Sequence, residues 1–184
     1  VACVPSWFTV EERRLLRRAL QATGVQLLAL ILDGSALALY TRSRSPLLRK
    51  AAFVDVGQGG ASVVIAELEP RGIRVVASTG SREAGGDAVD DAYVSGHRAS
   101  LHLDEIATGR RAVLEAVRRG FVSMKHDLEH MTESVVPAPF LPPDHPGELP
   151  ILHLTTSDFD ELCRPAMRSL GECCRRALAE ELDV

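Results

Sequence analysis

The sequence lacks the features that mark membrane-spanning and nucleic-acid-binding proteins. No apolar run approaches the roughly 20 residues that a bilayer span requires, and the longest, residues 25–32, has the length of a strand. The lysines and arginines are spread along a chain whose net charge is −4, which argues against nucleic acid and a membrane surface as partners. We therefore expect a soluble, cytoplasmic protein.

The sequence also offers little for a disulfide framework, a zinc site or a hydrolase. Its four cysteines form no C-x-x-C pair and have no matching histidine spacing; they are Cys3, Cys163, Cys173 and Cys174. We expect buried, reduced thiols and hence a reducing compartment. His126 and His130 lie four residues apart on an expected helix, so they are either metal ligands or solvated surface residues. No serine lies in a G-x-S-x-G context.

The composition fits a globular protein of one domain or two small lobes. The chain has 184 residues, of which 46% are hydrophobic, enough for a core. Its first part predicts a strand, a helix and a second strand, because Thr9 and Glu12 form a capping box and residues 25–32 are mostly apolar. Ser35 is expected to cap a short helix of small residues that needs close packing. Residues 41–50 are expected to link two lobes.

The middle of the chain predicts an antiparallel meander followed by helices. Apolar runs separated by glycine and proline turns place the strands at residues 51–56, 61–68 and 73–79. Helical periodicity follows at residues 86–99 and 110–131, where one stripe contains Val113, Val117 and Phe121.

The last part predicts a loop, a strand and a long helix. Residues 135–150 are rich in proline and are expected to form an exposed loop. A strand at residues 151–154 precedes a helix that is capped by Thr156 or Ser157 and runs nearly to the end of the chain. Pro165 lies too deep in this helix for its first turn, so we expect a kink or a restart there.

Residues 53–60 read FVDVGQGG, an apolar strand that contains Asp55 and continues into a turn with three glycines. Such a turn exposes backbone N–H groups with no side chains in the way, which is how a turn cradles phosphate oxygens. Asp55 would face the same place and could hold a hydrated magnesium ion. The alternative is a tight hairpin with an aspartate on its surface.

A second glycine pair, Gly85 and Gly86, lies between a strand and a helix whose first turns carry Asp87, Asp90 and Asp91. A helix N-terminus with free N–H groups can bind an anion, although these aspartates could equally be caps that compensate the helix dipole. Two glycine turns that can face one cleft favour a nucleotide phosphate as the ligand.

Several segments resemble the heat-shock protein 70 chaperones. VACVPSWFTVEERRLLRRALQATGV is similar, without a gap, to the segment that reads V-P-A-Y-F in that family and continues with an amphipathic helix and a glycine. FVDVGQGGASVVIAEL resembles the family's second phosphate motif, VVASTGSREAGGDAVDD the strand and Gly-Gly helix start after it, and FDELC the helix that closes lobe II. The order and spacing of these segments agree with the family over essentially the whole chain. The F-V-D-x-G pattern favours a divergent or larger, Hsp110-like branch of the family.

The resemblance implies an α/β, actin-like ATPase fold of the ribonuclease-H-like type, with ATP bound between two lobes. The chain would contain the end of lobe I and most of lobe II. Residues 1–45 would end lobe I, residues 46–84 would begin the inner subdomain of lobe II, residues 85–160 would form its outer subdomain, and residues 161–184 would be a closing helix that returns to the inner subdomain. Because the chain starts at Val1 rather than at a methionine, we expect an excised piece of a longer protein.

The resemblance also implies a site for ATP or ADP with Mg²⁺. Asp55 would hold the magnesium ion through water. The nucleotide would lie against Gly57, Gln58, Gly59, Gly60, Gly85, Gly86 and Lys125. The relay of the nucleotide state to a substrate-binding domain would run through Pro5, Arg13 and Asp33.

The chain departs from the family pattern at several of these positions. Gly60 stands where the family usually has a hydroxyl residue, and Ser62 stands where it has a second aspartate, so phosphate and metal lose ligands. Asp33 keeps the carboxylate of the family's N-E-P-T-A-A-A segment on a shorter side chain. On the adenosine helix the family's glutamate, arginine and serine are replaced by Val122, His126 and Glu129.

In function, the resemblance implies part of the ATP-binding domain of a chaperone in which nucleotide controls the binding of unfolded polypeptide clients. J-domain co-chaperones and nucleotide exchange factors would be its partners. The family's first phosphate loop and catalytic lysine lie outside these residues, so we expect no catalytic residue and no ATP hydrolysis in this segment alone. One alternative is a pseudo-ATPase that serves as an interaction platform or exchange factor. Another is a sugar or acetate kinase of the same superfamily, against which the VPSWF segment argues.

Overall fold

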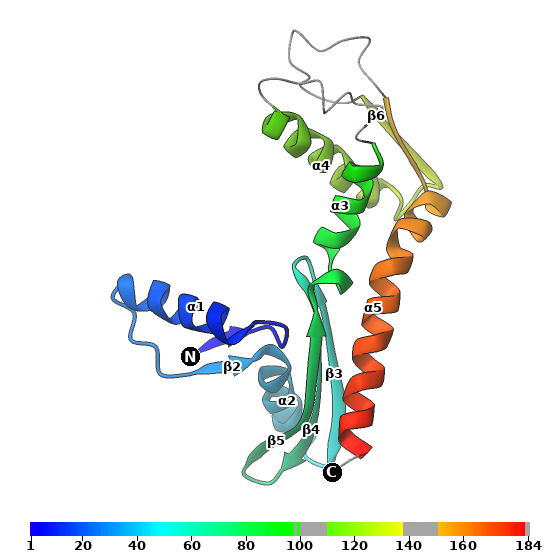
Figure 1. Ribbon diagram of the computed structural model, residues 1–184. Coiled ribbons are helices and arrows are strands. Elements are labelled where there is room, and N and C mark those ends of the chain that lie inside the picture. Colours follow the sequence, from blue (N-terminus) through cyan, green and yellow to red (C-terminus); the bar gives the residue numbers. More distant parts are fainter. Residues whose placement is uncertain (98, 100–109, 138–150, 183–184) are drawn as a thin grey trace. The chain divides into compact units, whose positions relative to one another are not determined.

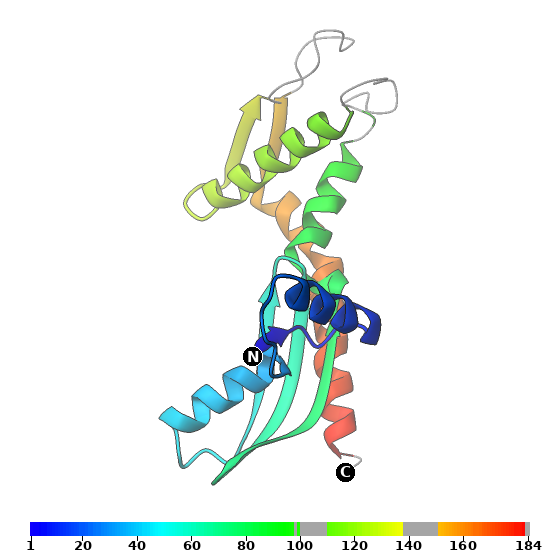
Figure 2. The same ribbon diagram turned by 90° about the vertical axis from the view of Figure 1, so that its left-hand side faces the viewer.

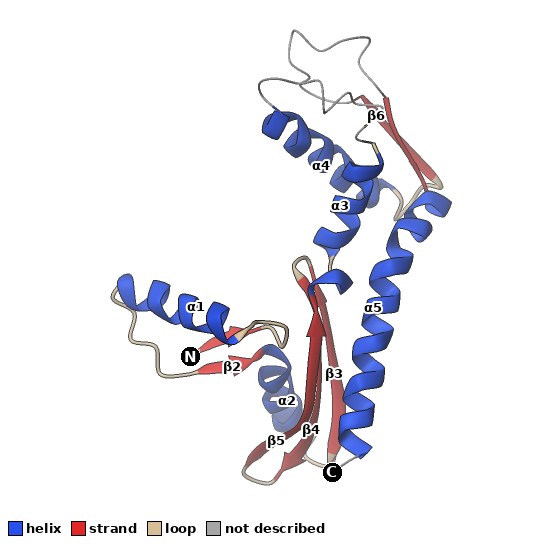
Figure 3. Cartoon of the chain, viewed as in Figure 1, coloured by secondary structure: helices blue, strands red, loops and turns tan. Residues whose placement is uncertain are grey.

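The computed structural model describes residues 1–97, 99, 110–137 and 151–182 (Figure 1). The chain divides into two compact units, the first formed by Val1–Gly86 with Ala166–Val184 and the second by Asp87–Pro165. Each unit combines helices and strands (Figure 3). Within the described ranges, no helix has both the length and the apolar character needed to cross a membrane.

The first unit opens with two short parallel strands joined by a helix. The elements are β1 (Ala2–Val4), α1 (Val10–Ala22) and β2 (Leu30–Leu32). α1 begins at the expected capping box, in which the Thr9 hydroxyl accepts a hydrogen bond from Glu12 N at 3.2 Å and the Glu12 carboxylate accepts one from Thr9 N at 2.8 Å. β2 covers only part of the strand expected at residues 25–32, because β1 offers it three residues to pair with.

The helix α2 (Asp33–Arg44) is the small-residue helix expected after the second strand, and it packs closely on the sheet. A Cβ atom at Gly34 would lie 2.5 Å from Val64 Cβ, so only glycine allows this approach. The prediction that Ser35 caps the helix is wrong. Ser35 lies buried inside the first turn, and no side chain caps this helix.

The expected antiparallel meander is confirmed. Its strands are β3 (Lys50–Gly57), β4 (Gly60–Glu69) and β5 (Gly72–Ser81), with β4 in the middle. Of residues 41–50, which were expected to link two lobes, the first four belong to α2 and Lys50 begins β3, and all ten lie within the first unit. α2 continues to Arg44 because no helix-breaking residue precedes Pro46.

β4 is buried on both faces, although it belongs to an antiparallel sheet. One face packs against α5 (Thr156–Leu182), in a cluster of Val63, Ile65, Ala77, Cys173 and Ala177. The other face packs against α2, in a cluster of Ala38, Val64, Ala66 and Leu68. The sheet is therefore a middle layer with a helix on each side (Figures 1 and 2). Antiparallel strands commonly alternate between buried and solvated side chains, and β4 shows no such alternation over its first seven residues.

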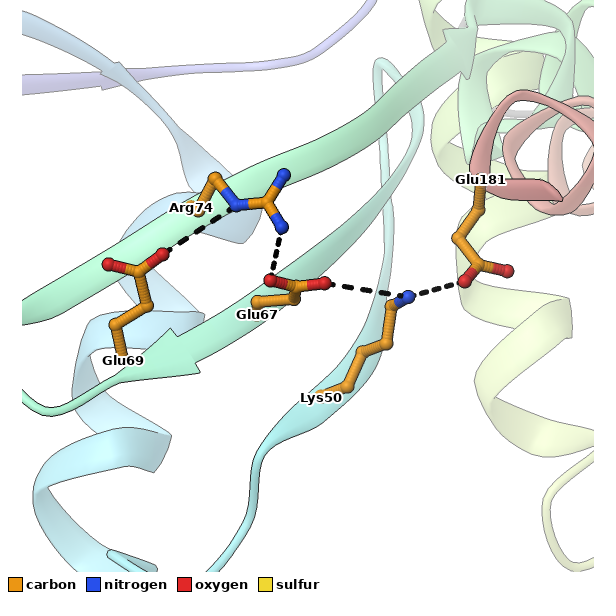
Figure 4. Close-up of polar contacts among 5 residues, drawn as sticks. All are labelled: Lys50, Glu67, Glu69, Arg74 and Glu181. Atoms are coloured by element: carbon orange, nitrogen blue, oxygen red, sulfur yellow. Dashed lines mark hydrogen bonds and ion pairs between the residues drawn. The ribbon is translucent and has the colours of Figure 1, made fainter. Parts of the chain in front are cut away.

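A network of charged side chains crosses the end of the sheet opposite the glycine turn (Figure 4). Lys50 on β3 pairs with Glu67 on β4, with 3.8 Å between Nζ and Oε1, and with Glu181 near the end of α5. Arg74 on β5 pairs with Glu67 and, at 3.6 Å, with Glu69. The hydrogen bond to Glu181 raises the pKa of Lys50 above its ordinary value. Because water screens such exposed pairs, the network mainly fixes the register of the strands and the position of α5.

The second unit packs two helices with a two-stranded antiparallel sheet. Its elements are α3 (Gly86–Gly96), α4 (Arg110–Asp127), β6 (Glu133–Pro137) and β7 (Ile151–Thr155). α4 buries the stripe expected from its periodicity, and its Phe121 ring stacks on Tyr93 with 4.2 Å between ring centres. The loop expected at residues 135–150 is partly wrong, because residues 135–137 pair with β7. Residues 138–150 lie outside the described residues.

The long helix α5 runs without interruption through Pro165, so the predicted restart is wrong. Its cap is Thr155 rather than the expected Thr156 or Ser157. The Thr155 hydroxyl accepts a hydrogen bond from Asp158 N at 3.1 Å, and the Asp158 carboxylate accepts one from Thr155 N at 3.1 Å. The Asp158 carboxylate also accepts a hydrogen bond from the Thr155 hydroxyl at 2.7 Å, and this bond, together with the one from Thr155 N, lowers the pKa of Asp158. Three hydroxyl residues in a row offered three caps, and the end of β7 selects the first.

All four cysteines are free, but the expectation of buried thiols holds for only one of them. Cys173 is buried, Cys163 and Cys174 are half-buried, and Cys3 is exposed. Burial raises the pKa of the Cys163 thiol. A raised pKa lowers the fraction of reactive thiolate at neutral pH.

Replacing Gly34 with alanine should destabilise the first unit. The added Cβ would lie 2.5 Å from Val64, so α2 must shift, and we expect the free energy of unfolding to fall by about 1–3 kcal/mol. Gly171→Ala in α5 is the matched control, because its Cβ would meet nothing within 4 Å and should be neutral or stabilising by about 0.5–1 kcal/mol. Urea unfolding measures both variants, and equal midpoints would contradict the close packing of α2.

Tyr93 should make the second unit sensitive to alkaline pH. Burial, with a smaller contribution from the Asp158 carboxylate, raises the pKa of Tyr93 to about 12. A phenol whose folded pKa exceeds its unfolded value of about 10 contributes stability that is complete below pH 10 and is lost as the pH rises towards 12. Tyr93→Phe should remove this part of the alkaline destabilisation. Thermal unfolding midpoints of the parent and Tyr93→Phe between about pH 10 and pH 12 test this expectation. Identical pH profiles for the two proteins would refute the raised pKa of Tyr93.

Candidate functional site

The glycine-rich stretch forms the tip of the β3–β4 hairpin. Gly57 and Gly60 are the last paired residues, which leaves Gln58 and Gly59 as a two-residue turn. Gly60 has a φ angle of 155°, a conformation that residues with side chains rarely adopt. The hairpin therefore presents the turn of nearly bare backbone that the sequence predicts.

The second glycine pair lies against this turn. It follows a short 3-10 helix, η1 (Arg82–Ala84). A Cβ atom at Gly85 would lie 2.2 Å from Gly60 N and 2.7 Å from Gln58 O. A Cβ atom at Gly86 would lie 2.6 Å from the side-chain oxygen of Gln58. The structure therefore brings both predicted glycine motifs together, with their backbones in contact, at one end of the sheet.

Asp55 lies on β3 directly opposite Ser62 on β4. Both side chains point to the face covered by α2, because Phe53 and Val64, two residues away on each strand, belong to the α2 cluster. Asp55 is exposed and forms no hydrogen bond or ion pair with the residues that the structure describes. Its carboxylate is therefore available to a hydrated cation beside the turn.

Ser62 links the sheet to α2 and to the N-terminal segment. It is only 3% exposed. Its hydroxyl donates a hydrogen bond to Asp33 Oδ2 at 2.9 Å and accepts one from Ser6 N at 2.9 Å. Asp33 Oδ1 accepts a hydrogen bond from Gly34 N at 2.6 Å, so both oxygens of this carboxylate are engaged.

Pro5 and Arg13 belong to the same arrangement. The Pro5 carbonyl accepts a hydrogen bond from Phe8 N at 3.1 Å. Arg13 on α1 donates to Phe8 O at 3.1 Å and to Ser6 O at 3.5 Å. Because Ser6 N in turn donates to Ser62, hydrogen bonds connect the residues predicted to form the relay.

A comparison with sequence profiles of protein families matches residues 1–182 to the family described as Hsp70 protein. The chain belongs to the Hsp70 family. The Hsp70 domain has the actin-like ATPase fold, and the mixed helices and strands agree with a part of it, so the predicted fold class is confirmed. A similar protein is the Chaperone protein HscA homolog of Shewanella piezotolerans (strain WP3 / JCM 13877), 26% identical over 180 residues. The match covers 98% of this chain and 28% of that protein, so the chain spans just over a quarter of this relative's length.

Lys125, which the Hsp70 resemblance assigns to adenosine, lies in the second unit. Its ammonium group pairs with Asp90 of α3 and lies 5.1 Å from the centre of the Phe121 ring. Asp90 is only 1% exposed, so this pair is a buried contact between α3 and α4. Lys125 therefore already has a structural partner, and its contact with adenosine stays a prediction.

The helix expected at residues 110–131 ends at Asp127, so His126 lies in α4 while Glu129 and His130 lie in the turn after it. His126 Nδ1 lies 3.8 Å from Glu129 Oε1. In the part of the chain that the structure describes, no three His, Cys, Asp or Glu side chains are grouped so that they could hold a metal ion. His126 and His130 therefore gain no third ligand there.

Sequence reasoning missed Trp7, whose indole lies on the glycine turn. A Cβ atom at Gly60 would lie 2.5 Å from the indole Nε1. Two departures from the Hsp70 pattern could have revealed the contact between Trp7 and the glycine turn. Tryptophan stands at the tyrosine of V-P-A-Y-F, and glycine stands where the family usually has a hydroxyl residue. The larger ring fills the space that the smaller residue leaves.

Ser62→Ala should destabilise the first unit by about 1–3 kcal/mol, because it leaves the half-buried Ser6 N–H without its acceptor and Asp33 Oδ2 without the Ser62 donor. Ser157→Ala is the control, since Ser157 is exposed and its loss should change the free energy of unfolding by no more than about 0.5 kcal/mol. Urea unfolding of the two variants provides the measurement. A loss at Ser62 no larger than that of the control would show that the hydrogen-bond chain is absent.

Proposed function

We propose that this chain is part of the ATP-binding domain of an Hsp70-type molecular chaperone, in which nucleotide binding controls the binding of polypeptide clients. The observation that carries the proposal is the contact between the two glycine motifs beside Asp55. Members of the Hsp70 family bind ATP or ADP with Mg²⁺. The HscA homolog that matches the chain is named as a chaperone protein.

The residues at the phosphate end fit a nucleotide with magnesium. At Gly85 and Gly60 the backbones approach so closely that no side chain fits between them, so a ligand at the turn would meet backbone groups. Asp55 stands exposed beside this turn without a partner in the described residues. Bound magnesium would neutralise phosphate charge. We assign Asp55 to that ion and assign to the phosphates Gly57, Gln58, Gly59 and Gly60.

The adenosine end fits less well. We assign Gly85 and Gly86 to the ribose side and Lys125 to adenosine, following the family resemblance. Lys125 is shared with the buried Asp90, and Val122 has no atom that accepts a hydrogen bond from a ribose hydroxyl. We therefore expect most of the affinity to come from the phosphate end.

The hydrogen bonds around Ser62 supply a physical route for the relay. If the Asp33 carboxylate turned towards a ligand, its hydrogen bond from the Ser62 hydroxyl, which is 2.9 Å long, would weaken. Ser62 also holds Ser6, and Arg13 holds the same segment to α1. A change at Asp33 would thus reach the segment that contains Pro5 through polar contacts alone.

The partners we propose are properties of the whole protein, of which the chain would be the nucleotide-responsive part. Unfolded polypeptide clients would bind a substrate-binding domain outside these residues. J-domain co-chaperones and nucleotide exchange factors would act on the nucleotide-binding domain.

A second candidate function is a pseudo-ATPase that serves as an interaction platform or exchange factor. The observation that favours it is the bond from the Ser62 hydroxyl to Asp33. A serine stands at the position of the second aspartate of the family, and its hydroxyl occupies one oxygen of the Asp33 carboxylate. This exchange removes one expected metal ligand and engages a carboxylate of the proposed relay.

Calorimetric titration of the full-length protein with Mg·ATP and Mg·ADP tests the first function. We expect dissociation constants of about 1 μM or tighter and a loss of at least about tenfold in Asp55→Ala, because this variant lacks the carboxylate beside the turn. Asp160→Ala is the control, since Asp160 is an exposed carboxylate in the second unit that forms no hydrogen bond or ion pair with the described residues.

Two results would decide against the first function. No binding by a folded parent protein would favour the pseudo-ATPase, whose ligands would be protein partners. Equal binding by the parent and Asp55→Ala would place the magnesium ion elsewhere.

A further inference from the structure

The side chain of Trp7 lies in a notch formed by three glycines. A Cβ atom at Gly60 would lie 2.5 Å from the indole Nε1, and one at Gly59 would lie 3.5 Å from Cζ2. The backbone of Trp7 lies close to β5, because a Cβ atom at Gly80 would be 2.9 Å from Trp7 N. A larger residue at Gly60 would push the indole out, and the indole in turn covers one side of the glycine turn.

A cation and a carboxylate hold the indole in this notch. The guanidinium carbon of Arg82 lies 4.7 Å from the centre of the Trp7 ring, the geometry of a cation–π contact. Arg82 also pairs with Glu12 of α1. Glu12 is itself fixed at the start of the helix by its hydrogen bonds with Thr9. The contacts therefore run from α1 to the glycine turn through three side chains.

We propose that Glu12, Arg82 and Trp7 form a latch that closes the glycine turn until a polyphosphate ligand displaces the indole. The inference rests on the proposed function, because it takes the turn as the phosphate site. A phosphate group is larger than the single carbon that would already collide with the indole at Gly60. The indole and a phosphate therefore cannot occupy this side of the turn together.

The ligand itself can open the latch. Guanidinium groups bind phosphate as well as carboxylate, so an arriving polyphosphate competes with Glu12 for Arg82. Arg82, the first residue of η1, then becomes a phosphate ligand close to the glycine turn. The Glu12–Arg82 pair is suited to such an exchange because the Arg82 side chain is 59% exposed, and an exposed pair is weak and screened by salt.

Glu12→Gln is the variant that tests the latch. A glutamine at this position keeps the capping box with Thr9 but removes the charge that pairs with Arg82. Glu11→Gln is the matched control, because Glu11 is the neighbouring residue of the same helix and pairs with Arg14, at 3.7 Å, instead.

Two measurements on the full-length protein read the latch independently. Calorimetric titrations with Mg·ATP and with inorganic tripolyphosphate give the dissociation constants. Acrylamide quenching of Trp7 fluorescence gives the accessibility of the indole without any ligand, and the emission of Trp7 is identified by its loss in Trp7→Phe.

We expect Glu12→Gln to bind both probes about two- to fivefold more tightly than the parent, the size of effect that one exposed ion pair exerts. Its indole should be more accessible to acrylamide, and Glu11→Gln should match the parent in both measurements. In the parent, addition of Mg·ATP should also expose the indole.

The contrary outcomes separate the latch from the proposed function. Unchanged quenching in Glu12→Gln overturns the latch, whatever the binding result. Mg·ATP binding that is equal in all three proteins, with the indole released, also overturns the latch and leaves the proposed function standing. If Glu12→Gln binds neither probe although acrylamide quenching shows that its indole is released, the proposed function is overturned. The proposal that the indole controls access to the turn then falls with it.

Discussion

The contact between the backbones at Gly60 and Gly85 sets the arrangement of the whole candidate site. Because neither residue carries a side chain, the tip of the β3–β4 hairpin reaches the start of α3 without an intervening layer. Glycine at residue 60 also leaves the room that the indole of Trp7 occupies. Asp55 is exposed on β3, two residues before the paired glycines that close the same hairpin. The proposed phosphate site and the indole that covers it therefore depend on one close approach of main chain to main chain.

Ser62 shows how one substitution can serve structure and weaken chemistry at the same position. A buried hydroxyl can both donate and accept, so it joins Ser6 to Asp33 in a way that an ionised carboxylate, which only accepts, could not. The gain is a polar link from the N-terminal segment to the central strand. The cost is a carboxylate missing beside Asp55. An ATP-controlled chaperone with altered metal binding and a platform without nucleotide both agree with this exchange.

The sequence predicted best the features that a few neighbouring residues determine. The capping box of Thr9 and Glu12, the meander with its glycine turn and the buried stripe of α4 are local patterns, and the structure contains all of them. β6 was not predicted because it borders a proline-rich stretch and is stabilised by pairing with β7, which lies beyond that stretch. The bond between Asp33 and Ser62 joins residues 29 positions apart, and the cover of Trp7 depends on tertiary approach. No periodicity encodes either contact.

The burial of β4 on both faces has a consequence for how this sequence can vary among relatives. A strand with one face in water tolerates polar substitutions at every second residue, where the side chain points to the solvent. In β4 the odd positions face α5 and the even positions face α2, and two independent helices therefore constrain consecutive residues. Substitutions in this strand should be restricted to an unbroken run of small and branched apolar residues, so β4 should drift more slowly than β3, whose outer residues Val54 and Val56 are half-exposed.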